Sequence, residues 1–231
     1  MTHYHHLFFD LDCTLWDFIT NSGEALFEIY ETYQLQPIFG EFDHFRNAFV
    51  KHNEDVWKDY REGKIHKDKL RIQRFERALK DYEVTNFELA QQLNEDFIAI
   101  SPAKAKLIPG TIEVLEYLKR KRYLMYIITN GFLNIQQIKI QASGIDRYFL
   151  KVFTPEIIGQ IKPHRAIFEY AVKSVNARKD QSLMIGDELE TDIIGARNFG
   201  MDQVFFNPGS IKHSQKVTYE ISNLLELKGL L

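Results

Sequence analysis

The sequence predicts an α/β fold in which a parallel sheet carries helices on both faces and a bundle of helices is inserted near its start. Two observations lead to this prediction. From residue 108 onward, short apolar runs alternate with segments of helical periodicity, the pattern of strand–helix units in a parallel sheet. Between residues 20 and 100, the apolar residues recur at helical spacing with no strand-like run between them.

The first strand is expected at residues 7–9, an apolar run that ends abruptly in two carboxylates, Asp10 and Asp12. In open α/β sheets the chemistry lies at the carboxyl ends of the strands. Two acids this close repel each other unless a positive charge neutralises them. The segment therefore predicts a site at the end of the first strand that binds a cation.

Residues 17–107 are predicted to form a helical domain that interrupts the α/β core. Four amphipathic helices are expected, with these apolar positions: Ala25, Leu26, Ile29, Tyr30 and Tyr33; Phe42, Phe45, Phe49 and Val56; Ile72, Phe75, Leu79 and Tyr82; Phe87, Ala90, Leu93 and Phe97. Arg71, Arg74 and Arg77 fall on one helical face, which we expect to be a solvated stripe. A helical insertion directly after the acidic loop suggests a cap that excludes water from a site.

The rest of the chain is predicted to alternate between helices and strands. The expected elements are a helix at 112–118, a strand at 123–129, a helix at 133–142, a strand at 152–153, a helix from Pro163, a strand at 182–187, a helix ending at Gly200 and a strand at 203–206. We therefore assign residues 1–16 and 108–231 to one Rossmann-like core domain with a parallel sheet, into which residues 17–107 are inserted.

Composition and charge argue against several classes of function. The 231 residues are 45% hydrophobic and 26% charged, and the formal net charge of −3 offers no basic field for nucleic acid. No apolar run approaches the roughly 18 residues needed to span a bilayer. Met1 to Tyr4 lacks the features of a signal peptide, and the single cysteine, Cys13, can form no intrachain disulfide. We therefore expect a cytoplasmic protein whose partners include neither a nucleic-acid polymer nor a membrane.

Four short motifs fall at the ends of the predicted core strands. They are Asp10-x-Asp12-x-Thr14, Thr129-Asn130-Gly131, Lys162-Pro163, and Gly186-Asp187 followed by Asp192. Taken singly, each has a structural explanation, because acids often cap turns and most lysines are exposed. All four in this order resemble the haloacid-dehalogenase-like (HAD) hydrolases with a helical (C1) cap, and the resemblance covers nearly the whole chain.

The resemblance implies a phosphatase that forms an aspartyl-phosphate, which splits a very slow hydrolysis into two steps. Asp10 would be the nucleophile. Asp12 would protonate the leaving oxygen and then activate water for the second step. Mg²⁺ would be the cofactor, bound by Asp10, the backbone carbonyl of Asp12, and Asp187.

The later motifs would bind the phosphoryl group of a small-molecule phosphate ester. By the same resemblance, the hydroxyl of Thr129 and the backbone N–H of Asn130, in the turn completed by Gly131, would hold phosphoryl oxygens. Lys162 would balance the negative charge of the phosphoryl group and of the nucleophile. Asp192 would orient Lys162 or a metal-bound water.

A second resemblance concerns the substrate. The segments that carry it are residues 8–15, 57–65, 127–132 and 162–171, which look like those of bacterial pyrimidine 5′-nucleotidases that clear noncanonical nucleotides. It implies a nucleoside monophosphate substrate such as a dUMP- or dTMP-like molecule, with Phe132 and Trp16 as candidate contacts. The alternatives are a phosphoglycolate or sugar-phosphate phosphatase, a phosphosugar mutase, and a non-enzymatic binding protein of the same fold.

Two other chemistries are disfavoured by the sequence. Dehalogenases of this fold lack the second acid of the first motif, whereas Asp12 is present here. Cysteine phosphatases place an arginine six residues after the cysteine, whereas Ile19 follows Cys13 at that distance. We therefore expect an inert thiol at Cys13.

Overall fold

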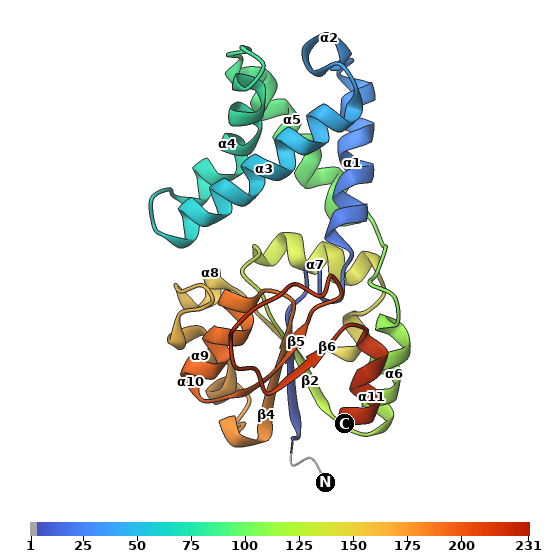
Figure 1. The fold of residues 1–231 in the computed structure, drawn as a ribbon, viewed down its shortest axis with the longest axis vertical. Coiled ribbons are helices and arrows are strands. Elements are labelled where there is room, and N and C mark those ends of the chain that lie inside the picture. Colours follow the sequence, from blue (N-terminus) through green and yellow to red (C-terminus); the bar gives the residue numbers. More distant parts are fainter. Residues whose placement is uncertain (1–3) are drawn as a thin grey trace. The chain divides into compact units, whose positions relative to one another are not determined.

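The computed structural model describes residues 4–231 and contains a six-stranded sheet in which every strand is parallel to its neighbours (Figure 1). The strand order is β3-β2-β1-β4-β5-β6. The strands are β1 (His6–Phe9), β2 (Leu124–Ile128), β3 (Lys151–Phe153), β4 (Ser182–Gly186), β5 (Asp202–Phe206) and β6 (Tyr219–Ile221). The predicted α/β fold is thus confirmed. The expectation about a signal peptide concerns Met1 to His3, which lie outside the described residues.

Strand β1 lies at the centre of the sheet because it is apolar along its whole length after His6. Its register aligns Phe9 with Ile127 of β2 on one side and with Ile185 of β4 on the other. The three strands therefore end at nearly the same level. The residues that directly follow them emerge together at one edge of the sheet.

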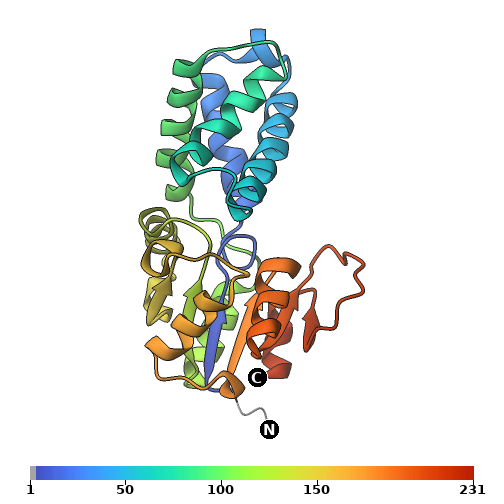
Figure 2. The same ribbon diagram turned by 90° about the vertical axis from the view of Figure 1, so that its left-hand side faces the viewer.

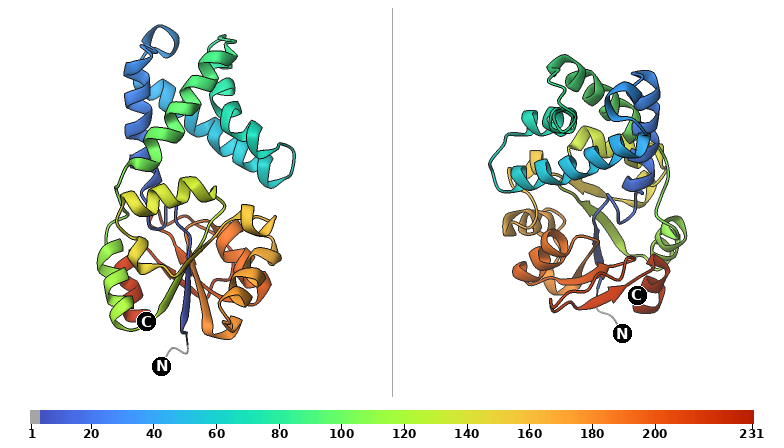
Figure 3. Two further views of the ribbon diagram at one scale, coloured as in Figure 1. Left: turned by 180° about the vertical axis from the view of Figure 1, so that it is seen from behind. Right: turned by 45° about the horizontal axis from the view of Figure 1, so that its top comes forward.

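Helices cover both faces of the sheet (Figure 3). Successive side chains of the strands pack on opposite faces. Leu7 and Phe9 belong to the core on one face, and Phe8 belongs to the core on the other. The first face is covered by α6 (Thr111–Arg120), α7 (Leu133–Ala142) and α11 (Leu227–Leu230). The second face is covered by α9 (Arg165–Ser174) and α10 (Gly195–Phe199).

Residues Ile19–Lys104 form a second compact unit, made of helices (Figure 2). Its helices are α1 (Phe18–Thr32), which begins one residue before the unit, α2 (Gln36–Phe39), α3 (Phe42–Arg61), α4 (Lys67–Lys80) and α5 (Phe87–Ile100). An apolar core rich in aromatic rings holds them together, with Phe39, Phe45, Phe49, Phe75 and Phe97 all buried. No helix among the described residues is both long enough and apolar enough to cross a membrane.

A few elements differ from the sequence-based expectations. Helix α9 begins at Arg165 rather than at Pro163, because the side chain of His164 caps it by accepting the N–H of Ala166. The helix that ends at Gly200 opens with a π-helical segment, Leu189–Ile194. The short elements α2, α8 (Pro155–Ile158), β6 and α11 were not expected, because three or four residues are too few to show a periodicity.

The expected solvated stripe of arginines is wrong for Arg74, which is only 6% exposed. Its guanidinium lies 4.6 Å from the centre of the Phe97 ring and donates hydrogen bonds to the side-chain oxygens of Asn53 (3.3 Å) and Asn94 (3.0 Å). Burial, followed by the charge of Arg71, lowers the pKa of Arg74 to about 9. The asparagines lie on two other helices, so the periodicity of α4 alone could not reveal this contact.

Replacing Arg74 with alanine removes the donor for both asparagine oxygens and leaves a cavity among aromatic rings. We expect the free energy of unfolding to fall by about 2–4 kcal/mol, measured by urea denaturation. The matched control is Lys69→Ala, an exposed position on the same helix, which should change the value by less than about 0.5 kcal/mol. Equal effects of the two substitutions would contradict the structural role of Arg74.

Candidate active site

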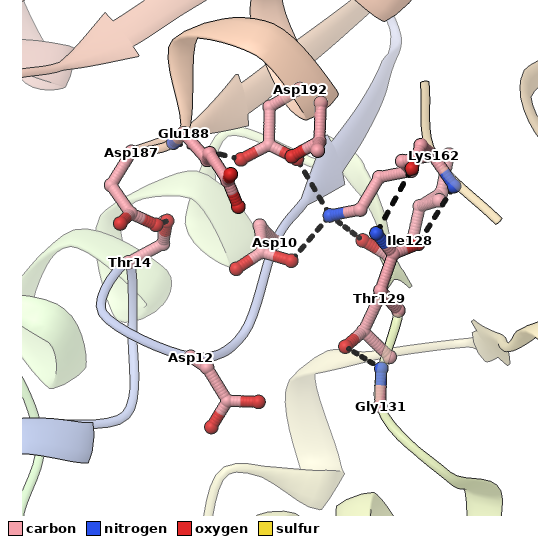
Figure 4. A network of polar contacts seen from close by, with 12 residues as sticks. Asp10, Asp12, Thr14, Ile128, Thr129, Gly131, Lys162, Asp187, Glu188 and Asp192 are labelled. Carbon is pink, nitrogen blue, oxygen red and sulfur yellow. Dashed lines mark hydrogen bonds and ion pairs between the residues drawn. The ribbon is translucent and has the colours of Figure 1, made fainter. Parts of the chain in front are cut away.

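Lys162 lies at the centre of the polar cluster at the strand ends (Figure 4). Its ammonium donates to Asp10 Oδ1 (2.5 Å) and to the backbone carbonyl of Ile128 (2.9 Å), and it forms an ion pair with Asp192 Oδ1 (2.6 Å). Lys162 is only 2% exposed, so these three oxygens replace water around the charge. Burial alone would lower the pKa of Lys162, but the charges of Asp10 and Asp192 outweigh it and raise this pKa above its ordinary value.

Asp187 completes a cluster of three carboxylates with Asp10 and Asp192. One oxygen from each lies within 4.8 Å of the others. Thr14 donates its hydroxyl proton to Asp187 Oδ1 (2.7 Å), which orients that carboxylate. Asp192 is oriented in turn by the backbone N–H of Glu188, which donates to Asp192 Oδ2 (3.1 Å).

The cluster brings three carboxylates to one ammonium. Burial raises the pKa of Asp10 well above its ordinary value; the charge of Lys162 opposes this, and the charges of Asp192 and Asp187 reinforce it. Burial, followed by the charge of Asp192, raises the pKa of Asp187 to about 7. When all three carboxylates are ionised, one ammonium leaves two negative charges unbalanced. The donor set of hard oxygen ligands fits a divalent cation such as Mg²⁺.

The structure separates the two acids of the first motif. The carboxylate of Asp10 lies in the cluster, whereas that of Asp12 points away from it (Figure 4). Asp12 Oδ1 accepts a hydrogen bond from Lys139 Nζ (2.6 Å), and Oδ2 accepts one from Gln136 Nε2 (2.8 Å). The two acids therefore have different partners, although only one residue stands between them.

The turn after β2 connects to both parts of the site. Thr129 Oγ1 accepts hydrogen bonds from the backbone N–H of Gly131 (3.0 Å) and from Gln136 Nε2 (2.7 Å). The side chain of Asn130 pairs with the backbone of Lys162 in both directions, donating to its carbonyl (3.1 Å) and accepting from its N–H (2.7 Å). The Asn130 side chain thus positions Lys162.

Two glycines of the motifs lie where a larger residue would clash with a neighbouring side chain. A Cβ atom on Gly131 would lie 2.2 Å from Gln136 Nε2, and one on Gly186 would lie 2.2 Å from Asp192 Oδ2. Neither glycine has a positive φ, so conformational freedom does not explain them. The missing side chains of these two glycines therefore leave room for Gln136 and Asp192.

Gln136 and Lys139 were missed in the sequence. Their helix, α7, was predicted at 133–142, but its apolar residues mislead, because Ile138 is 41% exposed while Lys139 is 6% exposed. The available signal was that Gln136, Lys139 and Ile140 share one helical face. Because Ile140 is a core residue, the two polar residues on its face could also have been expected to be buried. Buried polar residues next to the motifs are candidates for the site.

The expectations for three further residues, Trp16, Phe132 and Cys13, can be compared with the structure. Trp16 is fully buried, with Lys139 Nζ 4.4 Å from its ring centre, so its expected role as a substrate contact is wrong. Phe132 is 6% exposed and packs mainly inside the protein. Burial, reinforced by the charges of Asp187 and Asp12, raises the pKa of the Cys13 thiol above its ordinary value. A raised pKa disfavours the thiolate that a cysteine nucleophile needs.

The family is decided by comparison with known proteins. A model of the haloacid dehalogenase-like hydrolases matches residues 4–200. The chain belongs to the haloacid dehalogenase-like hydrolase family. This confirms the resemblance found in the sequence.

Relatives within this HAD family match over nearly the full chain. The pyrimidine 5′-nucleotidase YjjG of Escherichia coli (strain K12) is 30% identical, covering 97% of this chain and 96% of that protein. The pyrimidine 5′-nucleotidase PynA of Streptococcus pneumoniae is 31% identical, covering 97% and 93%. A crystal structure of YfnB from Bacillus subtilis, bound to magnesium and showing interdomain movement, superposes with a TM-score of 0.88 at 29% identity and covers 98% of each chain.

The substitution Gly186→Ala tests whether the close approach of Asp192 in this HAD core requires a glycine at position 186. The added methyl group would displace Asp192 and its ion pair with Lys162, so we expect the free energy of unfolding to fall by about 1–3 kcal/mol in urea denaturation. Gly23→Ala is the control, because nothing lies within 4 Å of its new Cβ in helix α1. That substitution should stabilise the protein by about 0.4–1 kcal/mol. A neutral Gly186→Ala would contradict the close approach.

Proposed function

We propose that the chain is a Mg²⁺-dependent phosphomonoesterase that acts through an aspartyl-phosphate on Asp10, with pyrimidine nucleoside 5′-monophosphates as its substrate class. The observation that carries the proposal is the pairing of Asp10 with the buried ammonium of Lys162 at the end of the central strand. The phosphoryl group of a substrate is negatively charged and would repel a carboxylate nucleophile. A buried positive charge beside the nucleophile reduces this repulsion.

The proposed reaction has two steps. In the first, a carboxylate oxygen of Asp10 bonds to phosphorus while the bond from phosphorus to the leaving oxygen breaks, and Asp12 gives that oxygen its proton. In the second, water attacks phosphorus, Asp12 takes the proton of the water, and the bond between Asp10 and phosphorus breaks. Each proton transfer of this kind contributes about 10²–10⁴-fold to a rate.

The loop after β2 and Lys162 would bind the phosphoryl oxygens. Thr129 Oγ1 already accepts two hydrogen bonds, so its own proton is the group that it can donate to a phosphoryl oxygen. The backbone N–H of Asn130 is proposed as a second donor, in the turn completed by Gly131. The charge of Lys162 would offset that of the phosphoryl group in a site with little water.

Mg²⁺ is proposed to be held by Asp10, Asp187 and the backbone carbonyl of Asp12, where it would neutralise charge and orient the phosphoryl group. The unbalanced carboxylates support a divalent cation, and the similar YfnB structure is bound to magnesium. Asp192 is also within reach of the cation, but its ion pair with Lys162 supports its expected role in orienting that lysine. Because only the backbone carbonyl of Asp12 is proposed to bind Mg²⁺, its side-chain carboxylate is available for proton transfer.

The substrate class rests on the relatives and on the helical residues 17–107, which we propose to be the cap that selects the substrate. YjjG and PynA are both pyrimidine 5′-nucleotidases, and they match this chain through its helical part as well as its core. The core of such a fold sets the chemistry, whereas a separate domain can set specificity. We propose the reducing cytoplasm as its compartment, because the chain has a single cysteine.

A phosphate-release panel tests the activity. With Mg²⁺, we expect dUMP and dTMP to be hydrolysed with kcat/KM at least about tenfold above phosphoglycolate and glucose 6-phosphate, the difference that about 1.4 kcal/mol of transition-state binding produces. EDTA should stop phosphate release, and added Mg²⁺ should restore it. Turnover that persists in EDTA would remove the metal from the proposal, and equal rates for all esters would remove the substrate class.

Asp10→Asn tests the nucleophile. Because the amide cannot form the acyl-phosphate, we expect phosphate release to fall by more than about 10³-fold, as losses of covalent nucleophiles do. The melting temperature of the variant is the control for its fold, since Lys162 retains its ion pair with Asp192. Activity within tenfold of the wild type in a folded variant would exclude Asp10 as the nucleophile.

A further inference from the structure

Helix α7 directs two polar side chains into the protein beside the proposed site. Gln136 and Lys139 are three residues apart and therefore lie on the same side of the helix. They are 0% and 6% exposed, which is unusual for a glutamine and a lysine. Neither residue belongs to the motifs that identify the family.

Both side chains contact the same carboxylate, one at each oxygen. Lys139 Nζ donates to Asp12 Oδ1 (2.6 Å), and Gln136 Nε2 donates to Asp12 Oδ2 (2.8 Å). A carboxylate held at both oxygens has a fixed position and a fixed plane. Each oxygen still has a second lone pair for another partner.

Gln136 also connects this carboxylate to the loop after β2. The same Nε2 atom donates to Thr129 Oγ1 (2.7 Å), so one amide group joins residues that follow two different strands. Its Oε1 atom is buried and has no hydrogen-bond donor among the described residues. Leaving a buried acceptor without a donor costs stability, so the two bonds made by Nε2 have to compensate for it.

Lys139 is packed so that its charge faces Asp12. Its ammonium lies 4.4 Å from the ring centre of Trp16 and 5.8 Å from that of Phe18. The side chain of Lys139 is 8% exposed, whereas that of Asp12 is 28% exposed. A substrate would therefore meet Asp12 and not Lys139, which means that any effect of Lys139 on the reaction passes through Asp12.

From these contacts we infer that Gln136 and Lys139 are positioning residues that hold the Asp12 carboxylate where it exchanges a proton with the leaving oxygen of the substrate. Gln136 additionally sets the distance between this carboxylate and the hydroxyl of Thr129, which is proposed to hold the phosphoryl group. The inference rests on the phosphomonoesterase function proposed above.

The test uses two aryl esters of similar size that differ in how much their leaving oxygen needs a proton. Phenyl phosphate has a poor leaving group, whereas 4-nitrophenyl phosphate leaves readily without one. In Lys139→Met and Gln136→Met, we expect kcat/KM for phenyl phosphate to fall by about 10–100-fold, because misplacing a proton donor forfeits much of its effect. For 4-nitrophenyl phosphate the fall in Lys139→Met should be less than about threefold, since its leaving oxygen gains little from general acid catalysis. In Gln136→Met the fall with this ester should be larger, because Gln136 also contacts Thr129, but it should stay well below the fall with phenyl phosphate.

The controls separate positioning from a structural role. Lys139→Arg keeps a cationic donor and should recover part of the loss with phenyl phosphate. Gln137→Ala, at an exposed position between the two residues, should leave both rates unchanged. Equal losses with both esters in Lys139→Met and Gln136→Met would overturn the inference, because a general structural defect does not distinguish leaving groups.

A failure of the proposed function is distinguishable from a failure of this inference. If the wild-type protein releases phosphate from no ester, the phosphomonoesterase proposal fails. Crystal structures of the wild type, Lys139→Met and Gln136→Met then decide the positioning role. A displaced Asp12 carboxylate in both variants would support it, and an unmoved Asp12 carboxylate would overturn it.

Discussion

The contact on which the site depends is the pairing of the buried Lys162 ammonium with Asp10 and Asp192. Three carboxylates cannot gather at the buried end of a sheet without a positive charge among them. The surrounding residues serve this contact: Asn130 fixes the backbone of Lys162, and Gly186 makes room for Asp192. The negative charge that one lysine leaves unbalanced is what makes a divalent cation a chemically reasonable partner.

The two acids of the first motif are close in the sequence, but their side chains contact different residues. Asp10 lies among carboxylates and Lys162, whereas Asp12 is held by Lys139 and Gln136. The first environment suits the nucleophile proposed for Asp10, and the second would hold Asp12 in place for the proton transfer proposed for it. Because Gln136 also contacts Thr129, the acid proposed to transfer protons and the turn proposed to bind phosphate are linked through helix α7.

The strands, the helices that separate them and the motif residues were predictable, because each motif follows an apolar run that reads as a strand. The partners of these residues were not. Lys139 and the buried Arg74 are charged residues on amphipathic helices, and such residues are normally exposed. Their burial depends on Asp12, Asn53 and Asn94, which lie on other elements and which no periodicity connects to them.

The proposed mechanism requires that Asp10 becomes phosphorylated during turnover. The most direct measurement is acid quenching of the wild-type protein during reaction with a ³²P-labelled phosphate ester, followed by peptide mapping, since acyl-phosphates survive in acid. If Asp10 is the nucleophile, the label will be on the peptide that contains Asp10 and will be released by hydroxylamine. Phosphate release in the assay with no labelled peptide, or with label on another residue, would contradict it.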